Sequence, residues 1–128
     1  MKLLLDTHAF LWWVDGTRPL GRRAATAVAD PDNQIFVSMA SCWELAIKLS
    51  LGKLRVARDL DRFITDELTS NGFDLLDVQL AHVVRVVDLP FRHRDPFDRL
   101  LVAQALEEEL SIVSNDRIFP QYGVRRVW

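Results

Sequence analysis

The sequence predicts an α/β fold in three layers, α/β/α, with a central, mostly parallel sheet of four or five strands. Short apolar runs alternate along the chain with longer segments whose apolar residues repeat at helical spacing. Strands separated by helices form parallel sheets that helices cover on both faces. The 128 residues, 49% of them hydrophobic, fit one compact domain over residues 1–128.

The expected strands are apolar runs that lie between glycine, proline and polar turn residues. Such runs suit strands that are buried on both faces of a parallel sheet. They are expected, in chain order, at residues 2–5, 34–37, 73–78, 111–113 and 124–127. Gly72 precedes the third strand, and Gly123 makes the turn before the last.

The expected helices lie between these strands. They are predicted at residues 7–14, 22–29, 38–51, 60–71, 80–87 and 96–110. Asp30-Pro31 stops the second helix, glycines stop the third and fourth, and Pro90 follows the fifth. The sixth helix begins with Asp95 as its N-cap and Pro96 at its first position.

Composition limits the compartment and the redox chemistry. Cys42 is the only cysteine, so there is no disulfide framework, and a reducing cytoplasm is the expected location. The N-terminal residues lack the apolar core of a signal peptide, and no run approaches membrane-spanning length. We therefore expect a soluble protein with no membrane partner, a buried, inert Cys42, and a surface or core role for His82 rather than metal binding.

Arginine dominates the basic residues. The formal net charge of −2 argues against a nucleic-acid partner if charge is treated as uniform. However, 13 of the 16 basic residues are arginine, whose guanidinium forks onto phosphate. Those that flank the acids near the end of the chain are candidate RNA contacts: Arg92, Arg94, Arg99 and Arg117. The alternative, favoured for any single arginine, is a solvated surface position.

Four acids beside strand or helix boundaries carry the main functional signal: Asp6, Glu44, Asp98 and Asp116. Asp6 and Asp116 each come soon after a predicted buried strand, and ligands of parallel sheets gather at the carboxyl ends of the strands. Glu44 and Asp98 would approach from the first turns of helices. Such a cluster repels itself unless a cation neutralises it, and oxygen ligands select Mg²⁺ or Mn²⁺ over zinc.

Structural roles for these acids stay open at this stage. Glu44 is spaced from Ser41 as in a capping box and from Lys48 as in a helix-surface ion pair. Asp98 would favourably oppose the dipole of its helix, and Asp116 suits a strand-end Asx-turn. We favour metal binding for Asp98.

These motifs resemble those of the PIN-domain family, and more narrowly of its VapC-type toxin ribonucleases. The resemblance rests on Leu5-Asp-Thr-His8, Ser41-Cys-Trp-Glu44, His93-Arg-Asp-Pro-Phe-Asp-Arg99 and Ser114-Asn-Asp116. It covers essentially the whole chain in order, and Asp-Pro-Phe-Asp-Arg is its most specific part. Ser114 stands where the family often has threonine, a change that keeps a hydroxyl.

The resemblance implies a metal-dependent endoribonuclease, the toxin of a type II toxin–antitoxin pair, that hydrolyses RNA with a metal-activated water. The catalytic and metal-binding residues would be Asp6, Glu44, Asp98 and Asp116, with Thr7, Asp95 and Ser114 in support. The resemblance also implies a homodimer and a VapB-like antitoxin laid across a hydrophobic groove. Candidate groove residues are Trp12, Trp13 and Trp43.

Competing interpretations are a catalytically silent binding module with an acidic pocket, and another metal-dependent phosphoesterase. A haloacid-dehalogenase-like phosphatase needs a second aspartate two positions after the first, where this chain has His8. A phospho-accepting receiver domain needs an acidic pair near its first strand, and Asp6 stands alone there.

Overall fold

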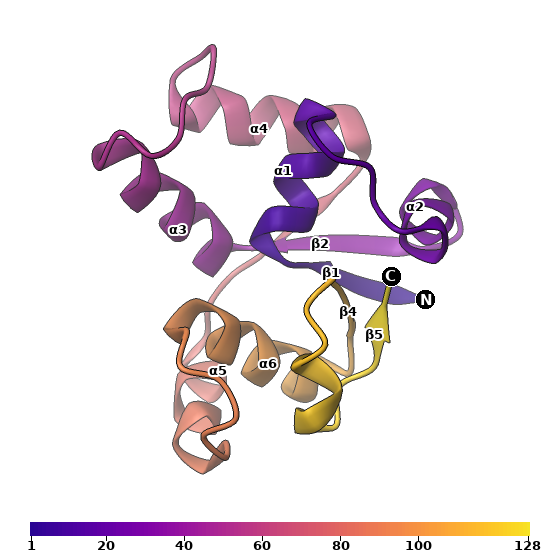
Figure 1. The fold of residues 1–128 in the computed structure, drawn as a ribbon, viewed down its shortest axis with the longest axis vertical. Helices are drawn as coiled ribbons and strands as arrows, with labels where there is room; N and C mark the ends of the chain where they lie inside the picture. The colour runs from indigo at the N-terminus through magenta and orange to yellow at the C-terminus, as the bar shows by residue number, and fades with distance from the viewer.

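The computed structural model describes residues 1–128 as a five-stranded sheet between two layers of helices (Figure 1). All pairings are parallel, and the strand order is β3-β2-β1-β4-β5. The strands are β1 (Lys2–Leu5), β2 (Gln34–Ser38), β3 (Asp74–Leu76), β4 (Ser111–Val113) and β5 (Arg126–Val127). The three-layer prediction is therefore confirmed.

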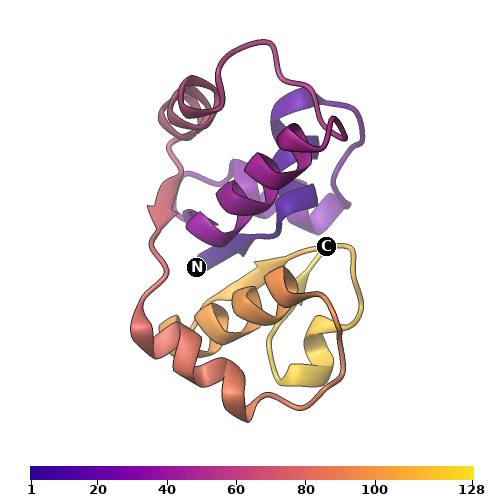
Figure 2. The ribbon, with the colours of Figure 1, turned by 90° about the vertical axis from the view of Figure 1, so that its left-hand side faces the viewer.

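The helices divide between the two faces of the sheet. They are α1 (Thr7–Asp15), α2 (Arg22–Ala29), α3 (Met39–Ser50), α4 (Leu60–Asn71), α5 (Leu80–Arg85) and α6 (Pro96–Glu108), with 3₁₀ turns η1 (Val86–Asp88) and η2 (Phe119–Tyr122). Figure 2 shows α3 and α4 on one side of the sheet and α5 and α6 on the other. No helix is both long enough and apolar enough to cross a membrane.

The central strand β1 pairs with β2 on one edge and β4 on the other, and helices pack against both of its faces. Leu3 and Leu5 pack in the same cluster as Phe10 of α1, whereas Leu4 packs in the other cluster with Leu101 of α6. All five side chains are fully buried. Successive strand residues face opposite sides, so a run of leucines suits this position. Asp6, the next residue, therefore stands at the middle of the carboxyl edge of the sheet.

Several element boundaries differ from the expected ones. β3 and β5 are shorter than predicted, because only Asp74–Leu76 pair with β2 and only Arg126–Val127 pair with β4. The fifth helix tightens into η1 after Arg85. The sixth ends at Glu108, because Glu109 adopts a left-handed conformation with φ 56°. The 3₁₀ turn η2 was not expected.

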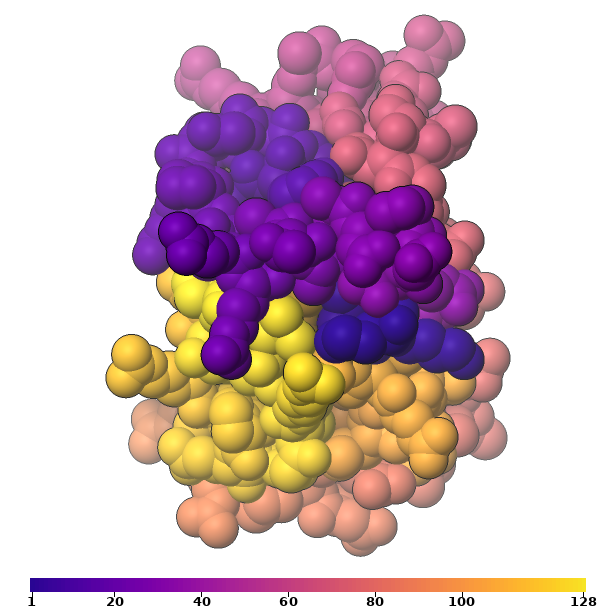
Figure 3. Space-filling model, turned by 90° about the vertical axis from the view of Figure 1, so that its right-hand side faces the viewer, coloured from indigo at the N-terminus to yellow at the C-terminus, as the bar shows by residue number.

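The C-terminal residues pack against the first half of the chain (Figure 3). A Cβ atom on Gly21, which precedes α2, would lie 2.6 Å from the carbonyl carbon of Trp128. The Trp128 ring packs edge-on against Trp12 of α1, with 6.0 Å between the ring centroids. A side chain at position 21 would therefore clash with Trp128, and one of the two would have to shift.

Two predicted core residues behave as expected. Cys42 is a buried free thiol, and burial raises its pKa to about 11, which keeps it protonated and unreactive. His82 is fully buried, with its Nδ1 accepting the backbone N–H of Gln79 at 3.0 Å and its Nε2 2.8 Å from Glu108 Oε1. Its role is to join α5 to α6.

Candidate metal centre

The carboxyl edge of the sheet opens into a cavity of about 320 Å³ with a mostly polar lining. All four acids singled out from the sequence line it: Asp6, Glu44, Asp98 and Asp116. Thr7 and Asp95 also line it, and Ser114 lies fully buried at the end of β4 beside it. The fold thus gathers acids from opposite ends of the chain at one place.

Asp6 is held by both β1 and α1. Its backbone N–H donates to Val113 O at 3.1 Å, and its Oδ1 accepts the N–H of Ala9 at 2.7 Å as the N-cap of α1. The residue is 6% exposed. Burial raises the pKa of Asp6, although hydrogen bonds from Ser114 and Ala9 oppose that shift. Charge on this carboxylate is therefore costly without a cation.

Asp98 is presented by a well-capped helix. Asp95 Oδ1 accepts the N–H groups of Phe97 at 2.8 Å and of Asp98 at 3.1 Å, and Pro96 occupies the first helical position, as predicted. The Asp98 carboxylate is therefore free to face the cavity. Burial, followed by the charge of Asp95, raises the pKa of Asp98 to about 7, while a hydrogen bond to His93 opposes the rise.

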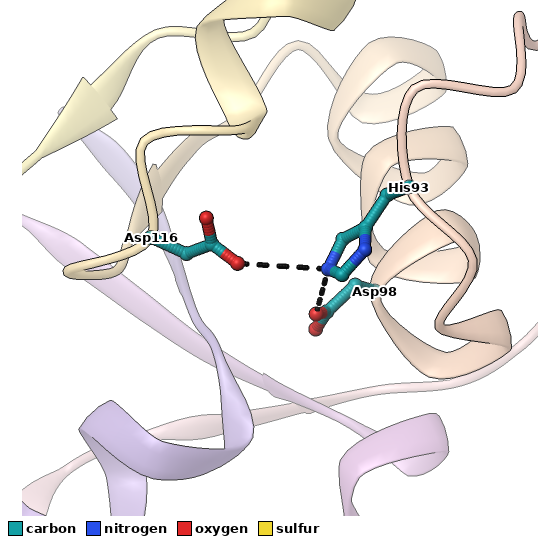
Figure 4. A group of neighbouring side chains, drawn as sticks. All are labelled: His93, Asp98 and Asp116. Atoms are coloured by element: carbon teal, nitrogen blue, oxygen red, sulfur yellow. Dashed lines mark hydrogen bonds and ion pairs between the residues drawn. The ribbon is translucent and has the colours of Figure 1, made fainter.

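Asp116 lies in the turn that follows β4. Ser114 Oγ accepts the N–H of Asp116 at 3.0 Å, and Asp116 Oδ1 accepts the N–H of Ile118 at 3.0 Å. The Asx-turn that we left open is therefore present. It uses only one carboxylate oxygen, since Oδ2 lies toward His93 (Figure 4). The turn orients Asp116 and leaves it able to bind an ion.

Glu44 does not belong to a capping box, which corrects one alternative from the sequence. The N-cap of α3 is Ser38, whose Oγ accepts the N–H of Ala40 at 3.0 Å. Ser41 Oγ instead accepts the hydroxyl of Thr7 at 2.9 Å, which ties α3 to α1. Lys48 Nζ lies 3.8 Å from Glu44 Oε2, so the helix-surface pair exists but is long. It leaves the glutamate on the cavity wall.

Three residues that line the cavity, His8, His93 and Asn115, were not predicted as functional groups, and His93 hydrogen-bonds to one of the acids. Its Nε2 lies 2.7 Å from Asp98 Oδ2 and 3.5 Å from Asp116 Oδ2 (Figure 4). These two acids and His93 offer ligand atoms within 4.8 Å of one another. His93 lies in an irregular loop before α6, where no repeating pattern predicts which way a side chain points. Its place in the His93–Arg99 motif was the only available signal.

The candidate RNA contacts do not share one environment. Arg92, Arg94 and Arg117 are exposed and follow or flank residues of the cavity. Arg99 is 7% exposed, and its Nη1 donates to Pro90 O at 2.9 Å and to Tyr122 Oη at 3.3 Å. Arg99 is therefore withdrawn as an RNA contact, because its guanidinium is buried among backbone carbonyls.

The donor set suits a hard divalent cation. Four carboxylates meet in a polar cavity, and two of them have raised pKa values because negative charge there is poorly solvated. A cation would offset that cost, and oxygen-rich sites favour Mg²⁺ and Mn²⁺. The residues that could hold it are Asp6, Asp98 and Asp116, and Glu44 lines the same cavity.

Comparisons with known proteins identify the family and the fold. A family model described as PIN domain matches residues 3–124. The VapBC2 complex from Rickettsia felis, bound to a promoter DNA fragment, contains a chain with TM-score 0.73 and 15% identity, covering 98% of this chain and 97% of that one. VapBC-1 from nontypeable Haemophilus influenzae contains a chain with TM-score 0.66 and 16% identity, covering 98% of this chain and 96% of that one.

A third solved structure has the same fold. FitAcB from Neisseria gonorrhoeae gives TM-score 0.64 and 16% identity, covering 97% of this chain and 95% of that chain. Among curated proteins, none matches the sequence.

Proposed function

This chain belongs to the PIN domain family, and from that premise we propose that it is a Mg²⁺- or Mn²⁺-dependent endoribonuclease. The observation that carries the proposal is the convergence of four carboxylates on one cavity: Asp6, Glu44, Asp98 and Asp116. A purely structural set of helix caps and turns would not need to meet in one place.

The four acids would bind the cation, and three neighbouring residues would orient the acids. A bound cation would activate a water for attack on phosphorus and stabilise charge on the phosphodiester. Asp95 caps α6 and so orients Asp98, while Ser114 supports Asp116 and Asp6. Thr7 fixes α3, and with it Glu44, through its bond to Ser41.

The exposed arginines would bring RNA to an acidic cavity. Arg92 and Arg94 flank His93 in the sequence, and Arg117 follows Asp116, so three exposed arginines are chain neighbours of residues that line the cavity. Arginine forks onto phosphate oxygens, and phosphate contacts supply most of the sequence-independent affinity for nucleic acid. Local charge rather than the net charge of −2 would then govern RNA binding.

We assign the nuclease to a type II toxin–antitoxin pair, located in the cytoplasm. Support comes from the solved relatives, described as VapBC and FitAcB complexes. A VapB-like antitoxin would cover Trp43, which is 61% exposed beside Glu44, and Trp12, which lines the cavity. Trp13 suits this role less well, because its indole N–H already donates to Asn71 Oδ1 at 3.0 Å.

A homodimer would bury the apolar face of α5 and η1. Leu80, Val83, Val84 and Val87 recur at helical spacing and are all more than half exposed. Contiguous exposed apolar residues mark interaction surfaces. A second copy of the chain is the proposed occupant.

RNA cleavage by the purified protein, freed of antitoxin, tests the nuclease proposal. We expect cleavage with Mg²⁺ or Mn²⁺ that stops on chelation, and that Asp98→Asn and Asp6→Asn abolish while the circular dichroism spectrum stays native. Cation binding without cleavage would support the silent binding module instead. Undiminished cleavage by both variants would place the active site elsewhere.

A further inference from the structure

His93 occupies the space between two of the proposed cation ligands. Its Nε2 is 2.7 Å from Asp98 Oδ2 and 3.5 Å from Asp116 Oδ2, and its side chain is 26% exposed (Figure 4). None of the acids needs this histidine for capping or for a turn. Its position therefore calls for a role in the site.

Hydrogen bonds define which ring nitrogen of His93 carries the proton. Nδ1 accepts the backbone N–H of Arg94 at 3.1 Å, so Nδ1 has no proton of its own. The proton is on Nε2, which donates to Asp98 Oδ2. A ring nitrogen that carries a proton has no lone pair for a metal. In this tautomer His93 orients a carboxylate rather than binding the cation itself.

Tyr122 holds the backbone of the His93 loop. Its hydroxyl oxygen accepts the N–H of Arg92 at 3.0 Å and the N–H of His93 at 2.8 Å. Tyr122 lies in η2, far from His93 in sequence, and is 8% exposed. One buried hydroxyl therefore fixes two consecutive peptide groups of an otherwise irregular loop.

Arg99 also holds this loop. Its guanidinium donates to Pro90 O at 2.9 Å, to Leu89 O at 3.4 Å and to Tyr122 Oη at 3.3 Å. The Phe91 ring covers it at 4.5 Å. No carboxylate pairs with this buried charge, which is costly unless its hydrogen bonds are well placed. The buried Arg99 and Tyr122 together form a clamp on residues 89–93.

We propose that His93 is a positioning residue of the cation site, and that Tyr122 and Arg99 set its position. The imidazole N–H holds Asp98 Oδ2 and leaves Asp98 Oδ1, which has no hydrogen bond in the protein, available to a cation. It also separates the Asp98 and Asp116 carboxylates before a cation arrives. This inference rests on the proposed function, because it assumes that these acids bind the cation.

The test measures Mn²⁺ affinity of the full chain by calorimetry without RNA, near neutral pH. His93→Ala should weaken Mn²⁺ binding by about 10- to 100-fold, the usual effect of removing a group that orients a metal ligand. His93→Gln should keep most of the affinity, because its amide N–H can still reach Asp98. Circular dichroism checks that each variant is folded.

Tyr122→Phe tests the clamp, because it removes the acceptor and leaves the ring. It should weaken Mn²⁺ binding, and combining it with His93→Ala should add nothing, because both act through one imidazole. Additive losses would overturn the clamp. Wild-type affinity in His93→Ala, or equal losses in His93→Gln and His93→Ala, would overturn the positioning role.

Asp98→Asn separates failure of this inference from failure of the proposed function. Loss of Mn²⁺ binding in Asp98→Asn alongside an unaffected His93→Ala would overturn the inference alone. A wild-type protein that binds no Mn²⁺ would overturn both.

Discussion

Replacing Asp98 with asparagine should stabilise the cation-free protein while it removes the cation response. Burial and the charge of Asp95 raise the pKa of Asp98 from 3.8 to about 7. Because the folded pKa lies above the unfolded one, the wild type loses stability as pH rises from about 4 through 7. Asparagine carries no charge at any pH and avoids that loss.

The size of the effect follows from the pKa. At about 1.4 kcal/mol per pKa unit, the rise in the pKa of Asp98 from 3.8 to about 7 corresponds to a loss of folding stability of at most about 4 kcal/mol. The Asp98 side chain is 23% exposed, and asparagine gives up a charge-assisted bond to His93. We therefore expect a net gain of about 1–2 kcal/mol above pH 7, or roughly 4 °C in Tm for each kcal/mol.

Thermal unfolding in EDTA and in excess Mn²⁺ measures both parts of this prediction. Mn²⁺ at about 100 times its Kd should stabilise the wild type by about 2.7 kcal/mol and should leave Asp98→Asn nearly unchanged. In EDTA, the advantage of the variant should grow from acid to pH 8. A variant that is less stable than wild type at pH 8, or that Mn²⁺ stabilises equally, would refute the reasoning.

Four further variants test other parts of the structure. Arg99→Lys should lower the free energy of unfolding by about 1–3 kcal/mol in a urea titration, because lysine cannot reach the same carbonyls; no change would contradict its clamp role. Arg94→Ala should weaken RNA binding and reduce the slope of log K against log salt concentration by about 1, and an unaltered slope would mean that Arg94 does not contact an RNA phosphate. Gly21→Ala should cost about 1–3 kcal/mol of stability, since its Cβ would meet Trp128 at 2.6 Å; a neutral result would mean that the C-terminal residues move aside freely. Val83→Asp should turn a dimer into a monomer by light scattering, and a persistent dimer would mean that another face forms the interface.

The sequence predicts the layers of this fold because the central strands are buried on both faces. Leu3, Leu4 and Leu5 form an apolar run that suits such a strand, and Asp6 directly follows it. That neighbour relation places Asp6 and Asp116 at one edge of the sheet by topology alone. The acids were recognisable for this reason.

Sequence spacing was a weaker guide to the N-cap of α3, for which the chain offers two serines. Ser41 has capping-box spacing to Glu44, yet Ser38 caps α3 because the helix begins directly at the end of β2. The start of a helix decides which polar residue caps it, and spacing alone does not define that start.

The loop before α6 was the least predictable part of the site. The sequence predicts that Arg99 contacts RNA because it stands beside Asp98, but Arg99 is buried and forms part of the clamp on residues 89–93. His93 reaches Asp98 only because Tyr122, distant in sequence, holds its backbone. Such long-range hydrogen bonds have no signature in local periodicity.

Anomalous diffraction from crystals of the protein with Mn²⁺ tests most directly whether these acids form a cation site. We expect a manganese peak within coordination distance of Asp6, Asp98 and Asp116, which should vanish in crystals of Asp98→Asn. Well-ordered carboxylates with no peak between them at saturating Mn²⁺, or a peak bound elsewhere, would contradict the account.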